Sequence, residues 1–295
     1  MLAGPVATRE VWGQRRRVQL AKRRSPPPSS DNASALVELE TVESAMNAVC
    51  AERQRDPLGS IPIDEMQARP SLPSVHPLAV AGARRAEQLL PMAKELAIDA
   101  LRQLARQYRI APARINGATA RIRAVTEISP DVDLRDNASV LLSDPHTINF
   151  GTIFLVGLQS DESMISVLAH ELTHIGDGRD DLLHSLFRQI GQRAAQLTGL
   201  NIYGHRPEEL TCDLVGASAA RAYIARTPNT EPVTRRLART VEHNCVVQDD
   251  TDDAHLSPRS TMRAVLALDG VLAHGLVTAN DFLPPRRTAV TLPPH

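Results

Sequence analysis

The sequence predicts an α+β fold that is mostly helical and contains a small, mainly antiparallel sheet. Stretches before residue 110 and after residue 160 carry apolar residues at helical spacing. Residues 118–158 instead contain short β-branched runs bounded by turn residues. The chain has 295 residues, which is long enough to bury a core, and only 3% of them are aromatic. The core is therefore expected to consist of aliphatic side chains.

Composition divides the chain into four segments. Residues 1–33 combine basic clusters with a proline run and are predicted to be a disordered, solvated tail. Residues 34–75 are predicted to form a helix and a proline-rich linker. Residues 76–283 are predicted to form the main folded domain, and residues 284–295, with four prolines, a second tail.

Apolar spacing predicts the first elements in order along the chain. Two helices are expected, over residues 34–54 and about 78–109. Three strands of one small sheet are then expected, over residues 118–128, 139–142 and 152–156. From residue 160 onward the pattern is again mostly helical.

The most informative segment is a predicted helix that begins near Ser160 and stops at Gly176 and contains His-Glu-Leu-Thr-His, an HExxH motif. His170 and His174 are four residues apart, so both imidazoles share one helix face and can bind one metal ion. Glu171 is rotated by about 100° from that face. It can therefore take a proton from a water molecule that the ion polarises. The motif predicts one zinc ion per chain.

A catalytic zinc site needs a third protein ligand, and a second predicted helix, starting at Pro207, offers one. Glu209 is the expected ligand. Asp213 shares its helix face and is expected to accept the ring N–H of a ligand histidine. Glu208 and Asp180 remain alternatives for the third ligand. Small residues on the second helix should let it pack closely against the HExxH helix; they are Cys212, Gly216 and Ala217.

The other global features exclude several classes of partner. A formal net charge of −1 gives no reason to expect nucleic acid. No apolar stretch approaches the roughly 18 residues of a membrane span, and the N-terminus lacks a signal-peptide hydrophobic region. Cys212 is expected to pack as a small apolar residue. A Cys50–Cys245 pair stays open, but reduced thiols and a cytoplasmic location are favoured.

With both motifs in view, the chain resembles the gluzincin metallopeptidases of the HtpX and CAAX prenyl endopeptidase family over residues 120–270. The resemblance lies in Val167–Ile175, Glu209–Asp213 and the run Ile153–Leu158. It implies a zincin-like fold for residues 76–283. It also implies that the run at 153–158 is a strand lining the cleft, where a substrate backbone could add to the sheet.

The chain departs from this family in two respects. Family members are often embedded in membranes, whereas this chain resembles soluble relatives. The family also has a C-terminal His-Pro followed by an arginine; Pro258 and Arg263 keep that spacing, but Ser257 replaces the histidine. Peptide hydrolysis needs a hydrogen-bond donor opposite the metal, and His255 is the first choice for this catalytic role. The alternatives are Arg263, His243 and Tyr203.

Together these features predict a zinc-dependent metalloendopeptidase that acts on protein or peptide substrates. Two other functions are kept open. One is a catalytically inactive zincin fold that serves as a binding or scaffold protein, and the other is a zinc hydrolase acting on a non-peptide bond. The sequence leaves the oligomeric state undetermined.

Overall fold

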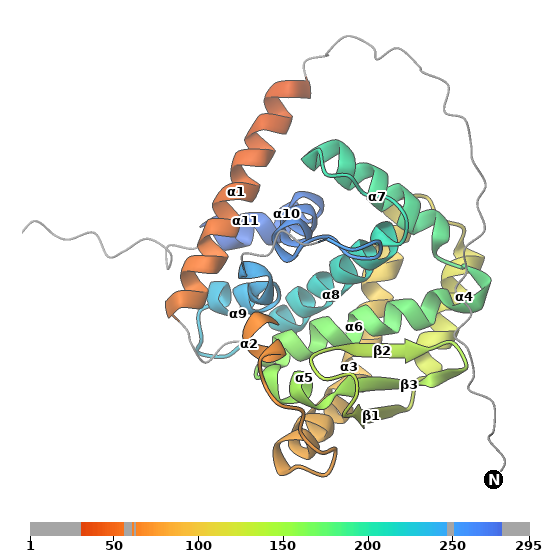
Figure 1. Cartoon of the computed structure of the whole chain (residues 1–295). Coiled ribbons are helices and arrows are strands. Elements are labelled where there is room, and N and C mark those ends of the chain that lie inside the picture. The colour runs from red at the N-terminus through yellow and green to blue at the C-terminus, as the bar shows by residue number, and fades with distance from the viewer. Residues whose placement is uncertain (1–30, 56–60, 62, 247–250, 279–295) are drawn as a thin grey trace, which may run out of the picture.

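The computed structural model describes residues 31–55, 61, 63–246 and 251–278, so most of the predicted N-terminal tail and all of the C-terminal tail lie outside it (Figure 1). The described chain is mostly helical with one small sheet, as predicted for an α+β protein. The helices are α1 (Asp31–Arg55), α2 (Ile63–Gln67), α3 (Pro77–Gln107), α4 (Pro112–Ala124), α5 (Thr152–Gly157), α6 (Asp161–Asp177), α7 (His184–Thr198), α8 (Arg206–Arg226), α9 (Val233–Arg239), α10 (Pro258–Leu268) and α11 (Gly270–Thr278), with short 3₁₀ turns η1 (Gly178–Asp180) and η2 (Glu242–Cys245).

The sheet has three strands in the order β1-β3-β2. Strand β3 (Asp144–Gly151) is central; β1 (Glu127–Asp131) pairs with it in parallel and β2 (Ala138–Leu141) pairs with it antiparallel. The sheet is therefore mixed, and the expectation of a mainly antiparallel sheet is wrong for one of its two pairings. Strand β2 lies at one edge and contacts α6, so the sheet lies beside the HExxH helix as expected (Figure 1).

Two of the three predicted strands are wrong. Most of residues 118–128 belongs to α4, where Ile115, Ala118 and Ile122 are buried at helical spacing and outweigh the local β-branched composition. Residues 152–156 belong to α5, because a short continuous apolar run does not distinguish strand from helix by periodicity. The third prediction, at 139–142, corresponds to β2.

The predicted helices before the sheet and around both motifs are confirmed. Ser160 caps α6 by accepting a hydrogen bond from the Ser163 N–H (3.1 Å), and the helix ends before Gly178, whose φ is +58°. Helix α8 packs against α6, as the small residues predicted. A Cβ built on Gly216 would lie 2.6 Å from the carbonyl oxygen of Ser166, so this position needs glycine. That close approach brings the two motifs together.

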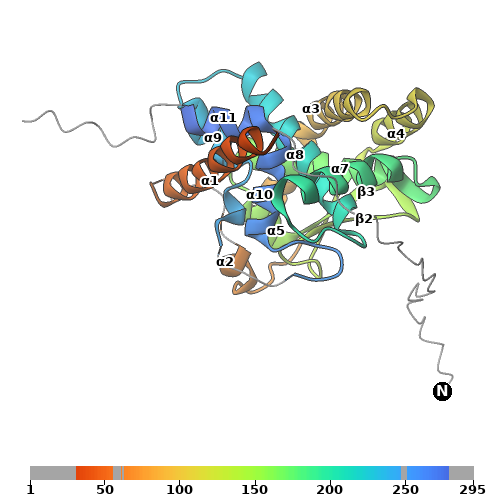
Figure 2. The ribbon, with the colours of Figure 1, turned by 90° about the horizontal axis from the view of Figure 1, so that it is seen from above.

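Helix α1 belongs to the same hydrophobic core as the motif helices, through its buried residues Val42, Ala45, Met46 and Val49. It packs against α10, α11, α9 and η2, and Figures 1 and 2 both show it beside α10 and α11. A disulfide between Cys50 and Cys245, with Cα atoms 5.4 Å apart, joins α1 to η2. The expectation that these two thiols are reduced is therefore wrong. Reduced thiols can thus no longer be used as support for a cytoplasmic location. Cys212 is buried and free.

A buried ion pair joins α9 to α6. Nε of Arg236 lies 2.5 Å from Oε1 of Glu162, and both side chains are almost wholly inaccessible to solvent. The same guanidinium donates to the main-chain oxygen of Thr227 (2.5 Å). Among the described residues, no single helix has the length and apolar character to cross a membrane, although α10 and α11, bent by 101°, meet that criterion as a pair.

Candidate metal centre

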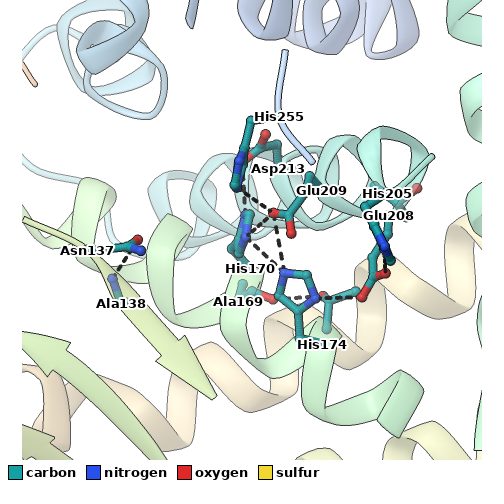
Figure 3. A network of polar contacts seen from close by, with 12 residues as sticks. Asn137, Ala138, Ala169, His170, His174, His205, Glu208, Glu209, Asp213 and His255 are labelled. Atoms are coloured by element: carbon teal, nitrogen blue, oxygen red, sulfur yellow. Dashed lines mark hydrogen bonds and ion pairs between the residues drawn. The ribbon is translucent and has the colours of Figure 1, made fainter. Parts of the chain in front are cut away.

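The α6–α8 contact brings His170, His174 and Glu209 to one point (Figure 3). The Nε2 atoms of the two histidines are 3.2 Å apart. Oε2 of Glu209 lies 3.4 Å from Nε2 of His170 and 3.5 Å from Nε2 of His174. Three donor atoms from two helices thus form a nearly equilateral triangle.

The size of this triangle suits a metal ion. A tetrahedral zinc ion with bonds of about 2.0–2.1 Å keeps its ligand atoms about 3.3 Å apart. The three observed separations, 3.2, 3.4 and 3.5 Å, lie on either side of that value. The donor set therefore fits a metal ion without rearrangement of the helices.

A carboxylate contacts the outer nitrogen of each of these histidines. Nδ1 of His170 lies 2.9 Å from Oδ1 of Asp213, which is where the sequence analysis expected this aspartate to act. Nδ1 of His174 lies 2.9 Å from Oε1 of Glu208. Such contacts hold the proton on Nδ1 and leave Nε2 free to bind a metal. Glu208, considered only as an alternative ligand, thus lies on the outer side of the site.

Electrostatics at the site favour a cation. Burial opposes protonation of His170, but the carboxylates of Asp213 and Glu209 outweigh it and hold the pKa of this imidazole well above its usual value. Burial likewise opposes protonation of His174, and Cys212 with the neighbouring carboxylates raises its pKa well above normal. Burial also opposes ionisation of Glu209, but hydrogen bonds from the histidines hold its pKa well below normal. A metal ion would replace these protons as the positive charge.

Cys212 is a second possible third donor. His170, His174 and Cys212 offer donor atoms that all lie within 4.8 Å of one another. The cysteine is fully buried, and burial raises the pKa of its thiol. We favour Glu209, because one of its oxygens lies within 3.5 Å of both Nε2 atoms and is already ionised.

Glu171 follows His170 directly on α6 and borders the same cleft. It is buried, at 6% exposure, yet its side chain borders the cleft beside the two histidines. Burial raises the pKa of its carboxyl, while the neighbouring imidazoles lower it. A carboxyl group with a raised pKa is a stronger proton acceptor once it is ionised.

The candidate site opens into a cleft of about 450 Å³ with both polar and apolar walls. Its walls come from α2, α5, α6 and α8, from the residues that precede β2, and from described residues between 243 and 261. The polar residues that line it outside α6 and α8 are Gln67, Asp136, Asn137, His243, Asn244, Asp252, His255 and Thr261.

His255 lies at the mouth of this cleft. Its Nε2 atom is 3.6 Å from Oε2 of Glu209, and its Nδ1 atom is 3.0 Å from Oδ2 of Asp252. Arg206, in the first turn of α8, donates to the main-chain oxygen of Asp252 from Nη2 (2.7 Å) and Nε (3.0 Å). His243 also lines the cleft, and burial lowers its pKa.

The remaining alternatives lie elsewhere. Asp180 is paired with Arg121 and is 71% exposed, which leaves it outside the metal centre. Nε of Arg263 lies 3.5 Å from the carboxylate of Glu43 in α1. Tyr203 is half exposed, at 51%. None of the three lines the cleft.

Sequence reasoning missed the contributions of Glu208 and Asp252. Glu208 was considered only as an alternative third ligand, whereas it contacts the outer nitrogen of His174 on the facing helix. Asp252 was given no role in the sequence analysis. The available signal was its position three residues before His255, at which an aspartate can cap a turn and reach the ring.

Comparison of the chain with protein-family models, with curated proteins and with solved structures found no match.

Proposed function

We propose that this protein is a zinc-dependent metallopeptidase of the gluzincin type. The observation that carries the proposal is the triangle of Nε2, Nε2 and Oε2 atoms with Glu171 beside it. Imidazole and carboxylate donors in a tetrahedral arrangement suit zinc. Once bound, zinc would act as a Lewis acid, lowering the pKa of a water molecule and polarising a carbonyl group.

Each protein group has a distinct part in the proposed reaction. His170, His174 and Glu209 hold the ion, and Asp213 and Glu208 orient the two imidazoles. Glu171 follows the first ligand directly on α6 but is not among the ligands. It accepts a proton from the attacking water and delivers it to the leaving amine.

The position of β2 at the edge of the sheet supports a peptide as the substrate. The main-chain oxygen of Asn137 accepts a hydrogen bond from Gly151 N–H (2.7 Å). In an antiparallel ladder hydrogen-bonded pairs alternate with pairs that are not bonded, so residues 137 and 151, and residues 139 and 149, are the hydrogen-bonded pairs. The backbone groups of Ala138 and Val140 therefore point away from β3. The N–H of Ala138 donates to the side-chain Oδ1 of Asn137 (2.9 Å), a contact that an added peptide would replace. An extended peptide can add to such an edge. In this proposal, strand β2 takes the place that the sequence analysis gave to residues 153–158.

Two histidines are candidates for the donor that stabilises charge on the substrate carbonyl oxygen. His243 and His255 both line the cleft, whereas Arg263 and Tyr203 do not. A donor to this oxygen contributes about 10²–10³ in turnover in peptidases.

The decisive experiment compares wild type with Glu171→Gln. Each protein is loaded with zinc, its metal content is measured by elemental mass spectrometry, and cleavage of an unfolded protein such as casein is followed. Both proteins should bind about one zinc per chain, and only wild type should cleave. Full cleavage by Glu171→Gln, or no zinc in wild type after a zinc titration, would reject the proposal.

A further inference from the structure

Three histidines at the metal centre share one arrangement. Each has Nδ1 against a carboxylate oxygen, at 2.9, 2.9 and 3.0 Å for His170, His174 and His255. Each has Nε2 directed at the same oxygen, Oε2 of Glu209, at 3.4, 3.5 and 3.6 Å. The three outer carboxylates belong to Asp213, Glu208 and Asp252.

This arrangement is typical of histidines that bind metals. A ligating imidazole usually donates its second N–H to a carboxylate, which fixes the tautomer and directs the free nitrogen to the ion. The 3.6 Å separation of His255 Nε2 from Glu209 Oε2 is also close to the spacing of about 3.3 Å expected between two zinc ligands. By both criteria His255 resembles the two histidines of the HExxH motif.

We propose that His255 is a fourth, displaceable ligand of the metal ion. The inference rests on the proposed function in requiring that zinc binds between α6 and α8. With His255 bound, four protein donors would surround the ion and close the position that a catalytic site keeps open. The substrate would then have to displace this ring, so the resting protein would be latent.

The placement of His255 suits a ligand that leaves. Its side chain is 60% exposed, against 20% for His170 and 15% for His174. The two motif histidines are held within α6, whereas His255 lies on the irregular segment before α10. Asp252 remains anchored to Arg206 through its main-chain oxygen, so the ring can move while its partner stays in place.

His243 provides a matched control. It also lines the cleft, but among the described residues its ring hydrogen bond is to the side-chain amide of Asn244 (3.3 Å) rather than to a carboxylate. Its electrostatic environment includes Asp213 and His170, so it lies near the same centre. It therefore lacks the feature on which the proposal depends.

The test is X-ray absorption spectroscopy of the zinc-loaded protein, with zinc affinity measured by chelator competition. Wild type and His243→Ala should show three imidazole ligands. His255→Ala should show two, with an added oxygen ligand, and a 10- to 100-fold weaker affinity. Asp252→Ala, which keeps the ring, should weaken affinity by about tenfold. An unchanged histidine count and affinity in His255→Ala would overturn the proposal. If that variant does not fold, unchanged affinity in Asp252→Ala would do so.

These readouts do not depend on peptide hydrolysis. Zinc bound by three imidazoles in a protein that cleaves no peptide would reject the proposed function and leave His255 as a ligand. Cleavage together with only two imidazole ligands in wild type would reject the ligand role. It would leave the proposed function intact, with His255 as a candidate donor.

Discussion

Oε1 of Glu208 lies 2.9 Å from Nδ1 of His174, while the adjacent Glu209 faces Nε2 of the same ring at 3.5 Å. Two consecutive acids of α8 thus contact opposite nitrogens of one imidazole. Because one would bind the ion and the other would only orient its ligand, the two acids should differ in their effect on metal binding.

We expect Glu209→Ala to lose most of the bound zinc, because it removes a direct ligand. Glu208→Ala should retain zinc at saturation with an affinity about 10- to 100-fold weaker. Cys212→Ala should bind zinc like wild type. Zinc content and chelator competition measure all three. Loss of zinc in Cys212→Ala with full binding in Glu209→Ala would assign the third ligand to the cysteine.

Asp177 should make stability depend on pH. Burial raises the pKa of its carboxyl from 3.8 to about 6, and its Oδ1 accepts a hydrogen bond from Leu183 N–H (2.5 Å). The unfolded chain ionises more readily, so this residue costs stability as pH rises from about 4 to 6, by up to about 3 kcal/mol. Asp177→Asn keeps the acceptor and should stabilise the protein at pH 7.5 but not at pH 4.

Urea unfolding of wild type and Asp177→Asn at both pH values measures this difference. Asp180→Asn is the control, since that exposed acid is paired with Arg121 at the surface and should change stability by less than about 1 kcal/mol. A gain from Asp177→Asn that is equal at both pH values would contradict the prediction.

Breaking the buried ion pair of Arg236 and Glu162 should lower the free energy of unfolding substantially. Glu162→Gln leaves the guanidinium charge buried without a counter-charge, so the free energy of unfolding should fall by about 3–5 kcal/mol. Asp99→Asn removes the partner of Arg226 in a pair whose side chains are about half exposed, and it should cost less than about 1 kcal/mol. Equal losses in urea unfolding would show that the buried pair contributes no more than the surface pair.

The disulfide should contribute measurably to stability. Cys50 and Cys245 are 195 residues apart, so their link restricts a long loop in the unfolded chain, and removing it should cost about 2–5 kcal/mol. A reductant should lower the melting temperature of wild type and leave that of the Cys50→Ser/Cys245→Ser variant unchanged. A wild-type melting temperature that does not respond to full reduction would contradict this expectation.

Local sequence was sufficient for the features that depend on helical periodicity. The spacing of His170 and His174 predicts one face of α6, and the small residue Gly216 indicates the close approach of α8. Local sequence was insufficient where a neighbouring element decides the outcome. The apolar run in α5 could have formed a strand, and the role of Glu208 depends on a histidine 34 residues away.

The covalent link between α1 and η2 has a consequence for proteolysis. Cys50 precedes and Cys245 follows all the residues of α6 and α8 that converge on the metal centre. A single backbone cut anywhere between the two cysteines would leave the two fragments attached to each other. A nicked molecule would therefore migrate as one species on a denaturing gel without reductant and as two with it. Its metal centre could survive a cut in an intervening surface loop.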